Sequence, residues 1–191
     1  SAASLSRAYV NNGGDIALHL SPGEHFTVGL VDRPDRPTMV GTTCIAAGDP
    51  SRGIATSGWR GRSFSLGIAD AITVLAATAA QADAAATVIA NAVDLLGHPG
   101  IIRVPANELQ PDSDLGARLV TRDVGTLSPS VIMIALESGA RQARALVEGG
   151  LIDGASLHLQ GETLTVALGN IAPAAAQRRM LPEPLHEMMD A

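Results

Sequence analysis

The turn signals of this chain constrain its fold more than any other feature. Clusters containing glycine and proline divide residues 1–78 into short apolar or alternating segments, each of a length typical of a β-strand. Only two longer stretches carry apolar residues at helical spacing: residues 79–96, and a stretch that begins at Ser128–Pro129 and runs to about Glu148. Strands therefore follow one another directly instead of alternating with helices, which favours an α+β fold over a doubly wound sheet.

This pattern predicts antiparallel strands in hairpins packed with two main helices. The segment 59–67 is expected to be a loop or a hairpin arm, and the polar segment 105–116 a loop. We expect residues 1–170 to form a single domain and residues 171–191 a C-terminal tail. The expected strands are 8–10, 15–20, 26–31, 39–47, 53–58, 70–77, 101–104, 118–124, 154–161 and 163–168.

The composition excludes several classes of function. The chain is 46% hydrophobic but only 2% aromatic, so its core must be built from aliphatic side chains, and stacking on nucleic-acid bases is disfavoured. The net charge is -6 and all 13 basic residues are arginines, with no basic run beyond Arg178–Arg179, which disfavours nucleic-acid binding. No segment is long and apolar enough to predict a membrane span. The single Cys44 fits a reducing compartment, so we expect a cytoplasmic protein.

A glycine-rich turn, Asn11-Asn12-Gly13-Gly14-Asp15, separates the first two strand segments. Consecutive glycines allow positive φ angles and a close approach of the backbone to a ligand. Turn N–H groups can hold a phosphate oxygen, and Asp15 can face a ribose or a metal ion. The same residues also suit a plain Asn-Gly hairpin turn with a capping aspartate. The residues themselves leave both interpretations open.

A second candidate segment has the sequence ATSGWRGRS. Thr56, Ser57 and Gly58 offer small hydroxyl groups and an accessible backbone. Arg60 and Arg62 lie two residues apart, so on an extended segment they share a face. Two guanidinium groups on one face suit a pyrophosphate. The alternative is a solvated hairpin with two surface arginines.

A third candidate lies in the first predicted helix, where Asp83 and Thr87 are four residues apart. On a helix they fall on one face, one turn apart. A carboxylate and a hydroxyl at this spacing can both reach one Mg²⁺ ion, whose remaining ligands would be water and a substrate phosphate. The alternative is that Asp83 helps to cap the helix while Thr87 bonds to its own turn.

Taken in order, the segments VNNGGDI, IATSG and ITVLAATAAQADAAAT resemble the core of the ApbE-type FAD:protein FMN transferases. The resemblance is closer to an uncharacterised ApbE-like family of bacterial and archaeal proteins. The segments GIATSGWRGRSFSLGIADAITVLA and DSDLGARLVT carry that closer likeness, which covers roughly residues 7–168. Resemblance to the wider superfamily implies a further N-terminal portion of the fold, which we expect to be missing from this sequence or to be a separately ordered segment.

The resemblance implies a function as well as a fold. ApbE-type enzymes bind FAD, use Mg²⁺ and transfer the FMN moiety to a Thr or Ser of a target protein. By matching motifs, Asp83 and Thr87 take the places of metal ligands. The segment from Asn12 to Asp15 lines the flavin-nucleotide site (FAD or FMN), and Thr56-Ser57-Gly58 lies beside it.

One departure from the transferases bears on activity. Their His-Ile-Ile-Asp-Pro loop is absent, and no histidine lies between His25 and His98. Arg60 and Arg62 occupy the shortened connection, where we expect them to contact an anionic ligand. The chain is therefore expected to bind a flavin nucleotide or a similar anion with Mg²⁺, with FMN transfer or pyrophosphate cleavage as its chemistry. The alternatives are a non-catalytic binding or assembly protein and an enzyme acting on a small anionic metabolite; a homodimer is left open.

Overall fold

The structure is a computed structural model that describes residues 5–33, 38–168 and 172–173. Its helices are α1 (Ala79–Ala92), α2 (Ala106–Leu109) and α3 (Pro129–Glu148). Its strands are β1 (Arg7–Asn12), β2 (Asp15–Leu20), β3 (His25–Val31), β4 (Met39–Ala46), β5 (Gly53–Ser57), β6 (Ala71–Ala76), β7 (Ile101–Pro105), β8 (Leu119–Val124), β9 (Gly154–Leu159), β10 (Glu162–Val166) and β11 (Ala172–Pro173).

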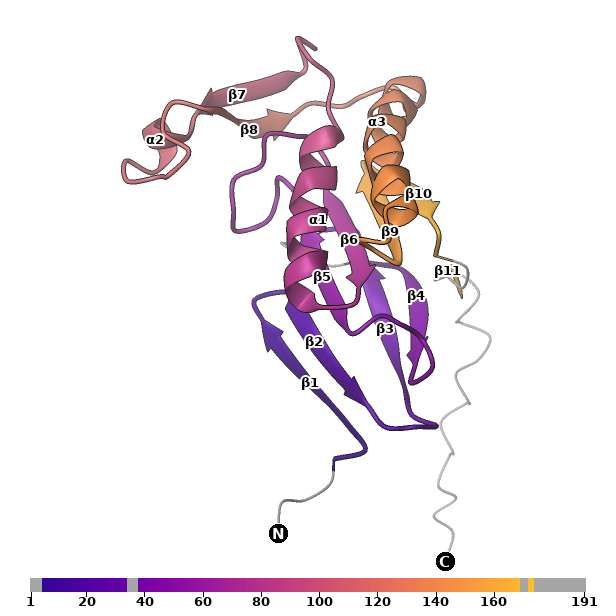
Figure 1. Ribbon diagram of the computed structural model, residues 1–191. Coiled ribbons are helices and arrows are strands. Elements are labelled where there is room, and N and C mark those ends of the chain that lie inside the picture. Colours follow the sequence, from indigo (N-terminus) through magenta and orange to yellow (C-terminus); the bar gives the residue numbers. More distant parts are fainter. Residues whose placement is uncertain (1–4, 34–37, 169–171, 174–191) are drawn as a thin grey trace, which may run out of the picture.

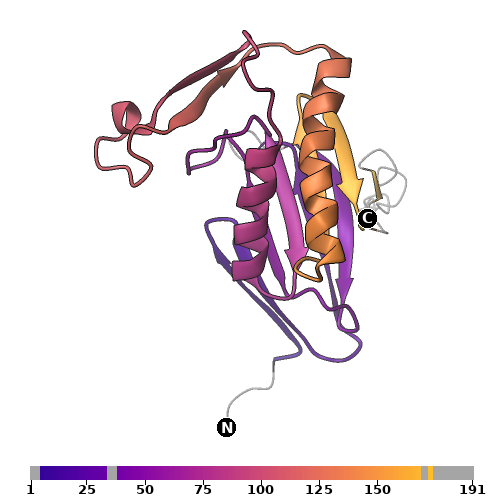
Figure 2. The same ribbon diagram turned by 45° about the horizontal axis from the view of Figure 1, so that its top comes forward.

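The central sheet has six strands in the order β1-β2-β5-β6-β9-β10, and each neighbouring pair is antiparallel. The first and last pairs are hairpins of adjacent strands. Helices α1 and α3 lie side by side across one face of this sheet (Figures 1 and 2). The predicted α+β architecture of antiparallel strands and two main helices is therefore confirmed.

Apolar cores lie on both faces of the central sheet. In β6, Ile72 and Val74 belong to the large core beneath α1 and α3, whereas Leu75 belongs to a smaller core. The smaller core also contains Ile45 of β4 and is packed against Phe26 of β3, so the β3–β4 hairpin covers the second face. Because both faces are covered, every residue of β6 and β9 is buried. We call the central sheet, β3, β4, α1 and α3 the body.

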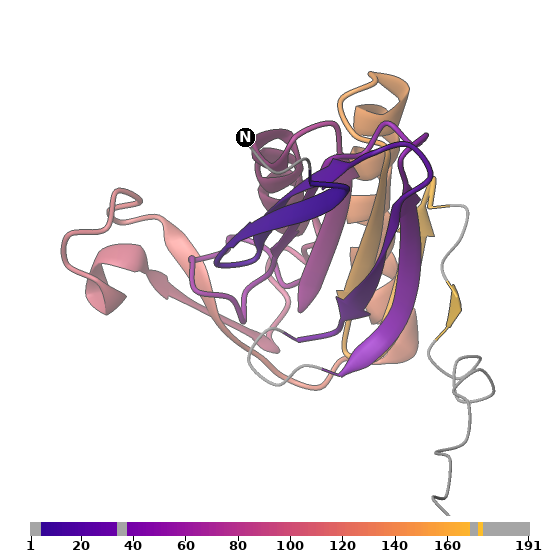
Figure 3. The same cartoon turned by 90° about the horizontal axis from the view of Figure 1, so that it is seen from below.

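Residues 99–125 form a separate projection, which we call the arm. Its strands β7 and β8 pair with each other in a two-stranded sheet, and α2 lies at the end distant from the body. The arm extends away from the body (Figures 1 and 3). Thr121 attaches it: its N–H donates to the Ser65 carbonyl at 2.8 Å, and its hydroxyl donates to the Gly67 carbonyl at 2.8 Å.

The first helix ends earlier than the sequence predicted. It was expected to reach residue 96, but Val93 has an extended backbone with ψ of 90°. The Val93 carbonyl accepts a hydrogen bond from the Ile68 N–H at 2.8 Å, so a loop of the body takes the place of the next helical turn. Gly67 allows this contact, because a Cβ there would lie 2.0 Å from the Ala90 carbonyl oxygen.

The second main helix begins as predicted, with Ser128 as N-cap and Pro129 in the first turn. The predicted loop 105–116 is wrong at Ala106–Leu109, which form the one-turn helix α2. Of the predicted tail, all but Ala172–Pro173 lies outside the described residues, and those two pair with β4. None of the helices in the described part of the chain has both the length and the apolar character needed to cross a membrane.

Candidate functional site

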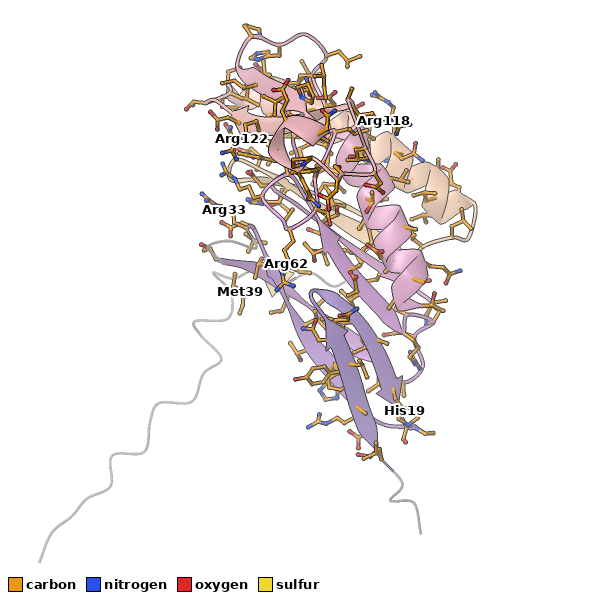
Figure 4. The ribbon with its side chains drawn as sticks, turned by 90° about the vertical axis from the view of Figure 1, so that its left-hand side faces the viewer. His19, Arg33, Met39, Arg62, Arg118 and Arg122 are labelled. Atoms are coloured by element: carbon orange, nitrogen blue, oxygen red, sulfur yellow. The ribbon has the colours of Figure 1, made fainter. Side chains whose placement is uncertain are left out.

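A pocket of about 630 Å³ lies where the β1–β2 turn, the loop after β5 and the exposed face of α1 meet. Figure 4 shows Arg62 close to the β1–β2 hairpin, between that hairpin and the arm. The pocket brings together segments that are about 70 residues apart in sequence, from the first turn to the first helix. The predicted site residues that line it are Asn12, Gly13, Asp15, Thr56, Ser57, Gly58, Arg60, Arg62, Asp83 and Thr87.

The β1–β2 turn lines the part of the pocket that lies next to Arg62. Gly13 and Gly14 have φ angles of +70° and +120°, as a two-residue hairpin turn requires. A Cβ at Gly13 would lie 3.1 Å from Nη1 of Arg62, so the absence of a side chain lets the guanidinium lie against the turn. Gly14 is not part of the lining, and its N–H donates to Oδ1 of Asn11 at 2.9 Å. The Gly14 N–H is therefore already paired within the turn, and a contact of Gly14 with a ligand stays a prediction.

The end of β5 supplies hydroxyl groups on a rigid backbone. Thr56 Oγ1 lies 2.9 Å from Thr73 Oγ1 on the neighbouring strand β6. Gly58 is buried against the return of the chain, since a Cβ there would lie 2.3 Å from the Asp70 carbonyl oxygen. The small residues of the ATSG segment thus reflect close backbone packing beside the pocket.

Two carboxylates line the same pocket. Asp15 comes from the start of β2 and Asp83 from α1, and both line the same cavity. Partial burial, and second the negative charge of Asp83, raise the pKa of Asp15 above its usual 3.8. Asp83 does not cap the helix, because the N-cap is Thr78, whose hydroxyl accepts from the Gln81 N–H at 3.2 Å. Asp83 and Thr87 are both exposed on the pocket side of α1.

The two arginines reach the pocket in different ways. The chain forms a turn from Gly58 to Gly61, where the Gly61 N–H donates to the Gly58 carbonyl at 3.0 Å. The segment is therefore a loop, one of the two forms expected for residues 59–67, and the condition of an extended segment under which both arginines would share a face is not met. Arg60 lies over the Trp59 ring, 4.1 Å from its centroid, whereas Arg62 is exposed beside the β1–β2 turn. Both still line the pocket.

Asp70 is a residue that the sequence reasoning missed. Its side chain is 5% exposed, and Oδ1 accepts from Arg60 Nε at 2.8 Å and from Trp59 Nε1 at 3.1 Å. Oδ2 accepts from the Gln160 N–H at 2.7 Å, which fixes that residue at a positive φ of 44°. The bond to Asp70 uses the Nε of Arg60, and no partner of its Nη groups is found among the described residues. Asp70 therefore orients Arg60 at the pocket.

The ring of His158 lies in the body near this network. Its Nδ1 is 2.8 Å from Thr163 Oγ1 on β10. Burial lowers the pKa of His158 below its usual 6.5, and the nearby charge of Asp70 opposes that effect. His158 belongs to the sheet and not to the pocket lining.

The oxygen donors in the pocket fit a hard cation that keeps part of its water shell. Within the described part of the chain, no three His, Cys, Asp or Glu side chains gather as a metal-binding group. Asp83, Thr87 and Asp15 instead offer two carboxylates and a hydroxyl group. Mg²⁺ is commonly held by one or two carboxylates together with waters and phosphate oxygens. These three groups fit a Mg²⁺ ion that keeps part of its water shell. They are too few to enclose the ion with protein ligands alone.

The fold and pocket define an α+β protein with carboxylates and arginines around one polar cavity. The sequence model of the family described as AbpE bacteria matches residues 1–165, so the chain belongs to that family. A stretch of 88 residues is 43% identical to a UPF0280 protein of Methanothermobacter thermautotrophicus. The match covers 44% of this chain and 32% of that relative, so the chain corresponds to about a third of the relative's length.

Proposed function

We propose that the pocket binds a flavin nucleotide, FAD in the first place, together with Mg²⁺. The observation that carries the proposal is the meeting of Asp15 and Asp83 with Arg60 and Arg62 around one cavity. Carboxylates bind cations and arginines bind phosphate oxygens. A pocket that contains both kinds of side chain therefore suits a metal-bound pyrophosphate. The volume of about 630 Å³ lies within the range of small-molecule sites.

The proposed roles divide among the residues by their chemistry. Asp83 and Thr87 would hold Mg²⁺, which would offset the negative charge of the pyrophosphate. The Nη groups of Arg60 and the guanidinium of Arg62 would bind the phosphate oxygens. Asp70 would keep Arg60 oriented when the pocket is empty. Resemblance to the ApbE-type transferases supports the choice of FAD among pyrophosphates.

The reaction that such a site supports is transfer or hydrolysis at the pyrophosphate. A hydroxyl oxygen of a protein target, or of water, would form a bond to the phosphorus of the FMN half. The bond from that phosphorus to the bridging oxygen would break, and AMP would leave with the bonding electron pair. The hydroxyl proton would pass to Asp15, the carboxylate in the pocket that is not assigned to Mg²⁺.

A non-catalytic binding protein is the second candidate, and one observation favours it. Among the described residues that line the pocket, none is a histidine, whereas the transferases that the sequence resembles carry a histidine loop. In that case the pocket would hold the nucleotide without cleaving it. We place either protein in the cytoplasm, which fits the free and exposed Cys44.

Calorimetric titration of FAD, FMN and ADP, first with Mg²⁺ and then with EDTA, tests the proposal. We expect FAD to bind in Mg²⁺ and to lose most of its affinity in EDTA. Asp83→Ala should abolish the Mg²⁺ dependence, and Asp112→Ala on the arm is the matched control. If Asp83→Ala leaves Mg²⁺-dependent binding intact, the metal site is elsewhere.

A chromatographic assay for AMP separates the two candidates. Release of AMP from FAD in the presence of Mg²⁺ supports an enzyme, and stable binding without AMP supports a binding protein. If none of the three nucleotides binds to the folded protein, flavin is the wrong ligand, and a small anionic metabolite becomes the subject of the search.

A further inference from the structure

Gln160 lies in a turn whose backbone geometry does not favour a glutamine. With Gly161 it forms the turn between β9 and β10, and the φ angles of the two residues are +44° and +90°. Two positive φ angles are characteristic of a type I′ hairpin turn, in which Asn and Gly are the usual residues. The left-handed conformation is strained for a residue with a long side chain. The local conformation therefore gives no reason for a glutamine at this position.

The side chain of Gln160 makes two hydrogen bonds to the backbone that leads from the arm into α3. Its Oε1 accepts from the Leu127 N–H at 3.0 Å, and its Nε2 donates to the Gly125 carbonyl at 2.8 Å. The Gly125 N–H in turn donates to the Gly100 carbonyl at 2.8 Å, so the two ends of the arm meet here. The amide group of Gln160 thus holds the β9–β10 turn against this junction.

The backbone of Gln160 makes a third hydrogen bond, which leads to the pocket. Its N–H donates to Oδ2 of Asp70 at 2.7 Å, while Oδ1 of the same carboxylate accepts from Arg60 and Trp59. The side chain of Asp70 is only 5% exposed, so a donor that is lost is not readily replaced by water. One oxygen is therefore held by the turn and the other by the pocket arginine. A displaced turn would let the carboxylate rotate, and Arg60 would lose its fixed acceptor.

We propose that Gln160 is a positioning residue for the pocket: its side chain anchors the β9–β10 turn, the turn orients Asp70, and Asp70 holds Arg60 for an anionic ligand. Gln160 is not among the described residues that line the pocket, so its effect on a ligand passes through Arg60. That Arg60 receives a phosphate rests on the proposed function. The orientation of Arg60 by Gln160 is a property of the chain itself.

Two substitutions remove the anchor and keep the turn. Asn and Gly both adopt positive φ angles readily, so Gln160→Asn and Gln160→Gly suit this backbone better than glutamine does. The asparagine side chain is one methylene shorter, so it cannot keep both hydrogen bonds to the junction at their present lengths. A role confined to the turn predicts no loss in either variant, whereas a positioning role predicts a loosened Asp70. Circular dichroism and urea unfolding check that both variants fold.

The single tryptophan gives a readout that needs no ligand. The indole N–H of Trp59 donates to the same Oδ1 as Arg60, and it gives one NMR signal because the chain has one tryptophan. We expect hydrogen exchange of this N–H to become about tenfold faster in both variants, while the backbone amides of β6 keep their protection. Gln110→Asn, the same change at an exposed position on the arm, should leave the exchange unaltered. Unchanged indole exchange in both variants, or equal acceleration in β6, would overturn the proposal.

Calorimetry with FAD and Mg²⁺ tests the consequence for binding. We expect Gln160→Asn to weaken FAD about fivefold, and to have no further effect in a chain that already carries Arg60→Ala. The same fivefold loss in both backgrounds would mean that Gln160 does not act through Arg60, and would overturn the proposal. If FAD does not bind to the wild type, the proposed function fails, and the indole exchange still decides whether Gln160 orients the Asp70–Arg60 pair.

Discussion

The body and the arm of this protein are stabilised by different means. In the body, β6 and β9 are buried on both faces, and most of their apolar side chains contribute to one of two apolar cores. In the arm, the two strands rest on a few buried side chains and on the hydrogen bonds of Thr121. The candidate ligand site lies on the body, and the arm leaves Ile102, Leu109 and Leu119 exposed. Close packing on both faces of the sheet positions the ligand site, whereas the arm has only a few buried side chains to hold it.

Two glycine substitutions, one in the body and one in the arm, should give the largest difference in the free energy of unfolding. Gly53→Ala in β5 would place a Cβ 2.0 Å from the Thr78 carbonyl carbon, where backbone must move, so we expect a loss of about 3 kcal/mol or more in the free energy of unfolding. Gly116→Ala in the arm meets no atom within 4 Å and only strains a φ of +56°, at a cost of about 1 kcal/mol. Urea unfolding measures both, and similar losses would contradict the comparison.

Removing the arginines of the pocket should weaken ligand binding without affecting the arm. We expect Arg60→Ala/Arg62→Ala to lower FAD affinity about 100-fold, or roughly 2.7 kcal/mol. Because Arg60→Ala also strips a partner from the buried Asp70, Arg62→Ala alone is the cleaner variant. Calorimetry gives the affinities, with Arg122→Ala on the arm as control. Unchanged affinity for every nucleotide would exclude an arginine-lined phosphate site.

Loosening the attachment of the arm should leave the body unaffected. Thr121→Val keeps the side-chain shape but removes the hydrogen bond to the Gly67 carbonyl, which should cost about 1 kcal/mol. Amide hydrogen exchange should become faster in β7 and β8, while protection in β6 stays the same. Equal acceleration in both regions would mean that arm and body open as a single unit.

The smallest expected effect concerns the two carboxylates of the pocket. Asp83→Asn removes a negative charge, so the pKa of Asp15 should fall, yet stay above 3.8 because partial burial remains. A raised carboxyl pKa means that the folded chain binds this proton more tightly than the unfolded chain. Stability from this group is thus present at low pH and is lost as pH rises through the raised pKa. NMR titration of Asp15 in the wild type and in Asp83→Asn measures the change. An unaltered titration would mean that the charge of Asp83 does not influence Asp15.

The sequence predicted the body well because its signals are local. Turn clusters delimit each strand, and Ser128–Pro129 together with Gly149–Gly150 delimit α3. The end of α1 was predicted wrongly, because the hydrogen bond from Ile68 to Val93 comes from a segment that no local pattern reveals. The helix α2 was missed because its one turn follows Pro105 and carries polar residues.

The candidate site was only partly predictable. The resemblance to a known family supplied the order of the three motifs, and that order placed Gly13, Thr56 and Asp83 in one expected site. The spacing of these residues in the sequence would not have brought them together. The separate orientations of Arg60 and Arg62 depend on the turn after Gly58, and the sequence predicted a loop or a hairpin arm there without the direction of either side chain. Asp70 was missed because a lone carboxylate at the start of an apolar strand carries no signal of the three partners that it binds.

The most direct test of the account asks where a divalent cation binds. Mn²⁺ added with FAD, in place of Mg²⁺, broadens the NMR signals of nearby nuclei. We predict simultaneous broadening in three separate segments of the body, at Gly13–Asp15, Thr56–Gly58 and Asp83–Thr87, with the arm signals of Asp112 and Asp114 unaffected. Broadening confined to the acidic end of the arm, or to only one of the three segments, would contradict a single metal–nucleotide site on the body.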